Sequence, residues 1–316
     1  MGKKTKLYFA TDIHGSEVCW KKFVNAARYY DVEVLVLGGD VTGKGMVYAV
    51  EQPDGSHNAS FMAREYSLKS AQELSEFESK VRSYGYYPFT TTKDEIDAIS
   101  QSEEKKHDVF LKLMIETLQR WIGFAEQKLK GSNVKLFVTA GNDDEFAIDP
   151  ILSTSDVVHH ADQKVVSIDE EHEMISSSYS NITPWRCPRD ITEEALAEKI
   201  EEMAGQVKNM KNCIFNLHVP PVNSTLDNAP LLNENLMPVD SGQRMVGVGS
   251  SAVRKAIEKH QPLLGLHGHI HESKGFTSIG RSLCMNPGST YSEGVVQGVV
   301  VRLSGSKVDS YMPVQG

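Results

Sequence analysis

The chain has 316 residues, 40% of them hydrophobic, and a formal net charge of -9. This length and composition suffice for a large buried core in one elaborated domain or two small ones. The acidic charge, without a long basic run, argues against binding to a nucleic-acid backbone. The sequence has no visible signal peptide or membrane span, and its four cysteines have no paired spacing, so we expect a cytoplasmic protein with reduced thiols.

Five short apolar runs predict buried strands of an α/β sheet. A helix is expected after the first run, over residues 16–30, with Ser16 as its N-cap, and it completes a βαβ start. The runs cover residues 6–10, 34–37, 134–138, 213–217 and 263–266. We also expect strands near 156–159, 164–168, 174–178, 282–285 and 295–303, and helices near 192–208 and 251–260.

A long segment separates the second run from the third. Asp40 and Asn142 stand 102 positions apart, more than a single crossover needs. The excess, about residues 46–131, predicts a helical insertion with one helix over 60–82 and a long one over 93–130. We expect this insertion either to cover the site described next or to contact another copy of the chain. Its aromatic residues at 84–89 are expected to pack beneath it rather than to stack on a substrate.

Short polar motifs follow the apolar runs. Ligands of open α/β sheets collect beyond the carboxyl ends of the strands, so we expect these motifs to meet at one edge of the sheet. The motifs are Asp12-Ile13-His14, Gly39-Asp40, Gly141-Asn142-Asp143-Asp144, the single His218, and Gly268-His269-Ile270-His271.

These residue types indicate a metal site. Carboxylates, imidazoles and an amide oxygen without thiolates suit Mn, Fe, Zn, Co or Ni rather than a structural zinc or calcium. In extended backbone, Asp-x-His and His-x-His place alternate side chains on one side, so each pair is expected to grip one ion. A carboxylate can bridge two ions, and Asp40 is the expected bridge. The candidate ligands are Asp12, His14, Asp40, Asn142, His218, His269 and His271.

The order of the motifs resembles that of the calcineurin-like metallophosphoesterases: Asp-x-His, Gly-Asp, Gly-Asn-His-Asp/Glu, a His, then Gly-His-x-His. The matches run from Asp12 to His271 and cover most of the chain. The resemblance implies one domain over residues 1–316, a four-layer α/β/β/α sandwich of two mixed sheets flanked by helices; the runs alone support only α/β. It also implies one ion held by Asp12, His14, Asp40 and His271, and another held by Asp40, Asn142, His218 and His269.

The same resemblance implies metal-dependent hydrolysis of phosphoesters. Two divalent ions, with Mn favoured, would lie about 3.5 to 4 Å apart and lower the pKa of a bridging water or hydroxide. Asp40, Asn142 and Asp143 are the implied catalytic residues. The expected substrate contacts are Asn142 and Asp143, joined by Arg244 from a predicted loop over 230–249. The expected partner is a small phosphate ester, with a nucleotide as one candidate.

One position departs from the family pattern. Asp143 stands where the family usually has a His that is thought to contact the phosphate and assist the leaving group. A carboxylate beside two cations donates no proton at neutral pH and repels a phosphate dianion. We therefore expect a preference for monoanionic diesters or good leaving groups. The alternative is a protein-binding scaffold with the same fold that is catalytically weak or inactive.

Three other signals allow more than one interpretation. Residues 38–45 nearly satisfy the phosphate-loop pattern of ATPases and kinases, but Gly45 replaces the required Ser or Thr and Asp40 would repel phosphate, so we discount it. Asp144 either matches the family's acidic position or simply opens a helix. His267 either orients a ligand or is a buried histidine at a strand end.

Overall fold

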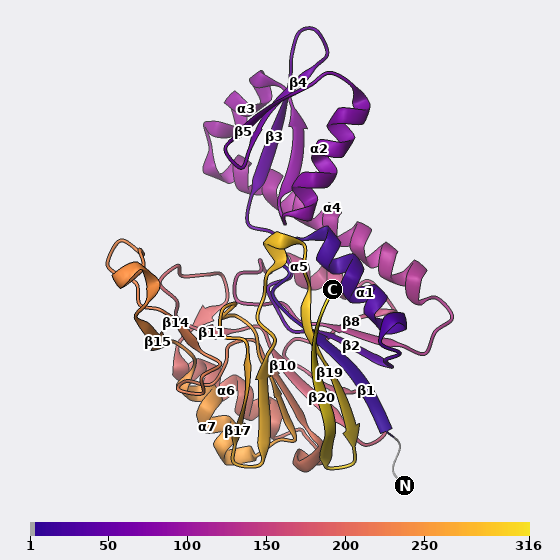
Figure 1. Cartoon of the computed structure of the whole chain (residues 1–316), viewed down its shortest axis with the longest axis vertical. Helices are drawn as coiled ribbons and strands as arrows, with labels where there is room; N and C mark the ends of the chain where they lie inside the picture. Colours follow the sequence, from indigo (N-terminus) through magenta and orange to yellow (C-terminus); the bar gives the residue numbers. More distant parts are fainter. Residues whose placement is uncertain (1–3) are drawn as a thin grey trace.

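The computed structural model describes residues 4–316, and two six-stranded mixed sheets form its body (Figure 1). The first sheet has the strand order β20-β19-β1-β2-β7-β8. Its inner parallel strands are mostly apolar, as expected for strands covered on both faces. The parallel strands are β1 (Lys4–Ala10), β2 (Val34–Leu37), β7 (Lys135–Val138) and β8 (Val158–His160), and β19 (Gln297–Ser304) and β20 (Lys307–Gln315) extend the sheet with antiparallel pairing.

The second sheet has the strand order β17-β18-β16-β13-β10-β9. Its four inner strands are parallel and its two edge strands are antiparallel to their neighbours. All five apolar runs of the sequence are therefore strands, as predicted. The strands are β9 (Val165–Ser167), β10 (Glu173–Ser177), β13 (Ile214–Leu217), β16 (Leu264–Leu266), β17 (Gly275–Ile279) and β18 (Ser282–Asn286).

Three apolar clusters join the sheets to each other and to the helices. Helices α1 (Glu17–Tyr29) and α4 (Glu103–Leu129) cover the first sheet, and there Trp20 stacks on Trp121 with ring centroids 5.2 Å apart. A second cluster, which includes Phe9 and Ile214, lies between the two sheets. Helices α6 (Glu193–Ala204) and α7 (Ser251–His260) cover the second sheet. The predicted α/β class, with two mixed sheets and flanking helices, is confirmed.

Within the predicted insertion over residues 46–131, the part before α4 projects from the body (Figure 1), and the insertion is not wholly helical as predicted. It contains a four-stranded sheet of order β5-β4-β3-β6, with its own small core around Phe61 and Phe77. The strands are β3 (Met46–Glu51), β4 (His57–Phe61), β5 (Arg64–Leu68) and β6 (Tyr87–Thr91), and the helices are α2 (Ala71–Ser83), α3 (Lys93–Ser100) and α4.

The β4–β5 hairpin replaces the first part of the helix predicted over 60–82. Its two turn residues, Met62 and Ala63, both have positive φ, 51° and 58°. This geometry suits a tight hairpin, but it usually carries Asn or Gly, so the sequence offered no turn signal. The helix predicted over 93–130 is two helices. The first ends at Ser100, and Ser102 caps the second, where its hydroxyl accepts a hydrogen bond from the Lys105 amide at 3.3 Å.

Helix α4 connects the projection to the body. Near its start, Phe110 packs against Tyr87 of β6, and further along Trp121 packs against α1. Tyr84 and Tyr86 pack against Phe61, which confirms that the aromatic residues at 84–89 are packing residues. Ser16 precedes α1 but does not cap it: its hydroxyl instead donates to the carbonyl of Ser83, at the base of the projection.

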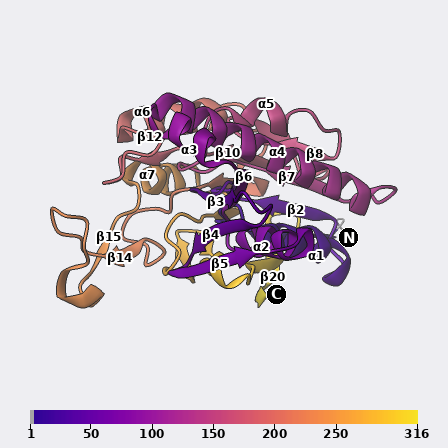
Figure 2. The same cartoon turned by 90° about the horizontal axis from the view of Figure 1, so that it is seen from above.

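Shorter elements complete the chain. The predicted loop over 230–249 contains a hairpin of β14 (Asn228–Pro230) and β15 (Met245–Gly247), which stands at one side of the body in both views (Figures 1 and 2). The other short elements are α5 (Ile148–Leu152), β11 (Ser180–Asn181), β12 (Asp190–Ile191) and three 3-10 turns at Met210–Asn212, Val239–Gly242 and Tyr291–Glu293.

Within residues 4–316, no helix combines the length and apolar character needed to cross a bilayer.

Candidate metal centre

The structure brings the predicted ligands together in two groups that share Asp40. Within each group, the potential ligand atoms lie within 4.8 Å of one another. The prediction that His269 and His271 grip the same ion is wrong, because they fall in different groups. The first group is Asp12, His14, Asp40 and His271, and the second is Asp40, His218 and His269, the division that the family resemblance implies.

Backbone hydrogen bonds hold the loops after the strands against one another. The amides of Asp12 and His14 donate to the carbonyls of Gly39 and Asp40, each at 2.9 Å. A Cβ atom at Gly39 would overlap the His218 ring, so this position needs glycine. The loops after β1 and β2 therefore form one rigid unit beside the second sheet.

Four candidate ligands have left-handed backbone, with φ of 53° at Asp12, 39° at His14, 44° at Asp40 and 67° at His269. Such angles are rare outside glycine and cluster at functional sites. The extended backbone predicted for the Asp-x-His and His-x-His motifs is therefore wrong.

The donor atoms fit divalent cations. The Nδ1 of His218 donates to the Gly38 carbonyl at 3.1 Å, which leaves Nε2 facing Asp40 Oδ1 at 3.4 Å. Within residues 4–316, this Nε2 atom and the Oδ1 of Asn142 are buried without a hydrogen-bond partner. The Nε2 atoms of His14 and His271 lie 3.0 Å apart. Buried acceptors without donors are costly, and a cation in each ligand group would satisfy them.

The charges of the group also suit cation binding. Burial raises the pKa of Asp40, but His218 and His14 outweigh that effect and hold the pKa of Asp40 well below its usual range. Burial lowers the pKa of His14 and of His269 to about 4, so both are neutral at pH 7. Burial opposes a charge on His218 as well, yet Asp40 raises the pKa of His218 to about 9. Cation binding should therefore release the His218 proton.

Asn142 is oriented by Asp190, a residue that the sequence analysis missed. The Asn142 Nδ2 donates to Asp190 Oδ1 at 2.9 Å, which turns the Asn142 carbonyl oxygen away from Asp190. The other Asp190 oxygen accepts from the amides of Thr183 and Cys187 at 2.9 and 3.0 Å. Asp190 thus fixes both the amide ligand and the loop over 183–187.

We expect Asp190→Ala to weaken Mn²⁺ binding by about 10- to 100-fold, the usual effect of losing a residue that orients a metal ligand. The reason is that Asn142 would be free to turn its NH₂ group towards the ion. Competition with a chelating dye would measure the affinity, with exposed Asp97→Ala as the matched control. Unchanged affinity in Asp190→Ala would contradict this role.

Asp144 ties two site loops together rather than opening a helix. It is buried and accepts from the amides of Gly141 at 2.7 Å, Val41 at 2.9 Å and Thr42 at 2.8 Å. Burial, aided by the Asp40 charge, raises the pKa of Asp144 to about 6. This carboxylate joins the loop after β2 to the loop after β7, and so places Asp40 next to Asn142.

Arg189 anchors the loop over 142–149 and was also missed from the sequence. Its side chain is buried, and its guanidinium contacts Asp149 at 2.8 and 3.2 Å and Asp162 at 3.5 Å. Its Nε donates to the backbone carbonyl of Asp144 at 2.8 Å, and its own backbone amide donates to the backbone carbonyl of Asn142 at 3.1 Å. No local sequence signal separates this arginine from a surface one.

A cavity of about 960 Å³ opens beside the two ligand groups. Its polar side includes Asp40, Asn142, Asp143, His269 and His271, and its walls come from residues 181–187 and 229–249, not from the insertion as one hypothesis proposed. Lys44 also lines the cavity, and its Nζ lies 2.7 Å from Asp143 Oδ2.

The substrate contact predicted for Arg244 has no support, since Arg244 is exposed and the hairpin lines the cavity through other residues, such as Ala229 and Val246.

Two weaker sequence signals have structural explanations. His267 is buried and its Nδ1 donates to the Leu217 carbonyl at 2.8 Å, which supports the buried strand-end interpretation. Residues 38–45 are not followed by a helix but by β3, as expected if they form no phosphate loop.

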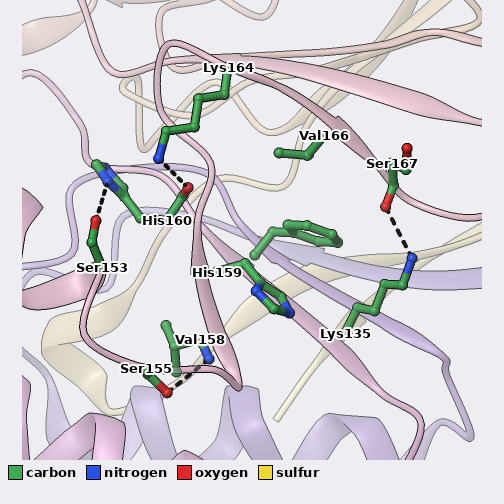
Figure 3. Close-up of a pocket in the computed structure, with 10 residues that line it drawn as sticks. Lys135, Ser153, Ser155, Val158, His159, His160, Lys164, Val166 and Ser167 are labelled. Atoms are coloured by element: carbon green, nitrogen blue, oxygen red, sulfur yellow. Dashed lines mark hydrogen bonds between the residues drawn. The ribbon is translucent and has the colours of Figure 1, made fainter.

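A second hollow, of about 470 Å³, lies where β8 of the first sheet approaches β9 of the second (Figure 3). Its lysines already bind backbone carbonyls. Lys135 Nζ donates to those of Ser167 at 3.1 Å and Ile168 at 2.9 Å, and Lys164 Nζ donates to that of His160 at 3.2 Å. We therefore assign the functional site to the cavity beside the ligand groups.

Comparisons with known proteins agree with this architecture. No protein-family model matches the chain. The uncharacterized protein MJ1162 of Methanocaldococcus jannaschii is 33% identical over 128 residues, which are 40% of this chain, and the chain spans about half (52%) of that relative's length. One crystal structure, 14% identical, aligns over 99% of both chains with a TM-score of 0.58. TT1561 of Thermus thermophilus, 11% identical, aligns over 98% of this chain and 99% of its own with a TM-score of 0.51.

At these identities the solved structures show a shared fold. The ligand motifs occur in the order that distinguishes one family, and the two-sheet body brings them to one place. The chain therefore shares the fold of these solved structures, and its ligand motifs stand in the order that resembles the calcineurin-like metallophosphoesterases.

Proposed function

We propose that the protein hydrolyses phosphoesters, preferentially phosphodiesters, at a dinuclear metal centre. The observation that carries the proposal is the pair of ligand groups that share Asp40 on the polar side of a large cavity. Manganese is the favoured metal among those that suit these ligands. When bound, two divalent ions activate a water molecule and stabilise charge on the phosphate oxygens.

Different residues of the chain have different roles in this proposal. Asp40 belongs to both groups and sets their separation, while the Asn142 carbonyl oxygen would join the second group. The cavity walls over 181–187 and 229–249 border the space that a phosphate ester would occupy. The remaining ligands are Asp12, His14 and His271 in the first group and His218 and His269 in the second.

Asp143 and Lys44 form an ion pair at the edge of this centre. Burial lowers the pKa of Lys44, but Asp143 outweighs that effect and raises it, so the ammonium stays charged. The Cys187 thiol donates to the other Asp143 oxygen at 3.5 Å. Lys44 offsets much of the negative charge that was expected to repel a phosphate dianion, so that part of the sequence argument is weakened. The preference for diesters rests instead on Asp143 being engaged as an acceptor and unable to supply a proton to a leaving group.

We expect the Mn²⁺-loaded protein to hydrolyse bis-p-nitrophenyl phosphate with a kcat/KM at least about 10-fold above that for p-nitrophenyl phosphate. EDTA should abolish both activities. Asp143→His, which restores an imidazole at this position, should raise monoester hydrolysis relative to diester hydrolysis, whereas Asp143→Asn should not.

Faster turnover of the monoester by the unaltered protein would contradict the diester preference. If neither ester is hydrolysed with Mn, Fe, Co, Ni or Zn, the scaffold alternative is favoured instead.

The expected substrate is a small phosphate ester. The proposal also includes contact between copies of the chain through the insertion. It further includes a cytoplasmic location, because all four cysteines are free thiols, as is usual in a reducing compartment.

A further inference from the structure

The cavity has two chemically different sides. The polar side carries the metal-ligand groups and Lys44. The second side is apolar and comes from two segments, the loop between β11 and β12 and the β14–β15 hairpin. We call this side the apolar wall; it is defined by Ile182, Pro184, Trp185, Leu231, Leu232 and Val246.

Part of the apolar wall is exposed, whereas its two leucines and Val246 are half-buried. Trp185 is 63% exposed and Ile182 is 56% exposed, and both lie on the rim of the same cavity. Single exposed apolar residues are ordinary, but a contiguous apolar surface beside convergent polar groups is typical of a ligand pocket. A phosphate group with its metal ions would occupy the polar side and would leave the apolar wall uncovered.

The loop that carries Trp185 is held in place from within the metal centre. Asp190 accepts from the amides of Thr183 and Cys187, on either side of Trp185, and also from the Asn142 side chain. Pro184 precedes Trp185 and restricts the backbone further. A rigid loop presents the indole at low entropic cost, which favours binding of a flat ring against its face.

We propose that the apolar wall binds the non-leaving substituent of the phosphoester and selects substrates in which this substituent is a planar aromatic ring. The inference rests on the proposed function and names its substrate class. Charge complementarity sets the orientation: the phosphate lies at Lys44 and the metal ligands, and the ring lies at Trp185. Such a ring can belong to an aryl ester or to a nucleoside base, because both stack in the same way.

The test uses p-nitrophenyl phosphodiesters that share one leaving group and differ in the other substituent: methyl, hexyl, phenyl and thymidine-5′-yl. The readout is the ratio of kcat/KM for each ring-bearing ester to that for the methyl ester, with Mn²⁺ present. Because the substituent also changes the intrinsic reactivity of the ester, the ratio is compared between the unaltered protein and Trp185→Ala. We expect Trp185→Ala to lower the ratio at least 10-fold through KM.

Trp185→Phe should retain most of the ratio, and Tyr29→Ala, at an aromatic residue that is 81% exposed on α1, should not alter it. A drop for the thymidine ester alone assigns the wall to a nucleoside, and a drop for the phenyl ester alone assigns it to an aryl group. A ratio that Trp185→Ala leaves unchanged, or an equal drop for the hexyl ester, overturns the inference while hydrolysis itself still supports the proposed function. If no ester is hydrolysed, the proposed function fails as well.

Discussion

Replacing Asp40 by asparagine is expected to lower metal-dependent kcat for bis-p-nitrophenyl phosphate by more than about 100-fold, beyond the usual effect of a residue that only orients a ligand. Asp40 is the member common to both ligand groups, whereas each histidine belongs to one. The neutral amide has about the same shape but lacks the negative charge that two adjacent cations require. Bound metal, measured by elemental analysis after gel filtration, should fall in the same variant.

Asp97→Asn provides the matched control, because Asp97 is exposed on α3 and far along the chain from the ligand motifs. Circular dichroism should show that Asp40→Asn remains folded. If Asp40→Asn retains full activity and full metal content, Asp40 does not bridge two ions and the assignment of the shared ligand is wrong.

Replacing Arg189 by methionine is expected to lower the free energy of unfolding by about 3–5 kcal/mol, the usual cost of removing one partner from a buried ion pair. Arg189 is buried, and its loss leaves the carboxylates of Asp149 and Asp162 without their cation. Two carbonyls of the loop over 144–145 lose a donor at the same time. Since this loop follows Asn142 and Asp143, metal affinity should fall together with stability.

Urea denaturation in EDTA would measure the unfolding free energy without a contribution from bound metal. Arg28→Met is the matched control, because Arg28 is exposed on α1 and its loss should change stability by no more than about 0.5 kcal/mol. A similar, small change in both variants would show that Arg189 does not anchor the site loop.

Local sequence predicted the strands after which the candidate ligands lie. A strand covered on both faces must be a continuous apolar run, so residues 34–37 and 214–217 are readable as strands. A polar motif directly after such a run has only the sheet edge to occupy. These two facts place Asp12, Asp40 and His269 together without any knowledge of the distances between them.

Features that depend on tertiary contact were not readable. The Lys44–Asp143 ion pair joins residues 99 positions apart, and the glycine-rich sequence around Lys44 does not identify Asp143 as its partner. Arg189 looked like any surface arginine, because burial is a property of its neighbours. A weak signal did exist for the apolar wall: Trp185 lies between Pro184 and Pro188, and a tryptophan in a proline-rich loop is a candidate for binding.

The same limit explains the insertion. Helical periodicity was visible in α4 as the spacing of Leu111, Ile115, Leu118 and Ile122, and Leu118 and Ile122 are buried there. The β4–β5 hairpin was not visible, because Met62 and Ala63 adopt a turn that ordinarily needs Gly or Asn. Packing on Phe77 and Val81 of α2 stabilises this turn, and that packing is a non-local effect.

The most direct test of the dinuclear hydrolase is a Mn²⁺ titration of the demetallated protein, followed by the rate of bis-p-nitrophenyl phosphate hydrolysis. Protein without a histidine tag is needed, because added imidazoles bind the same ions. The ligand groups around Asp40 predict that the rate rises from zero and reaches its plateau at two equivalents of metal per chain. A plateau at one equivalent, or a rate that stays at zero as metal binds, would contradict a dinuclear phosphoesterase.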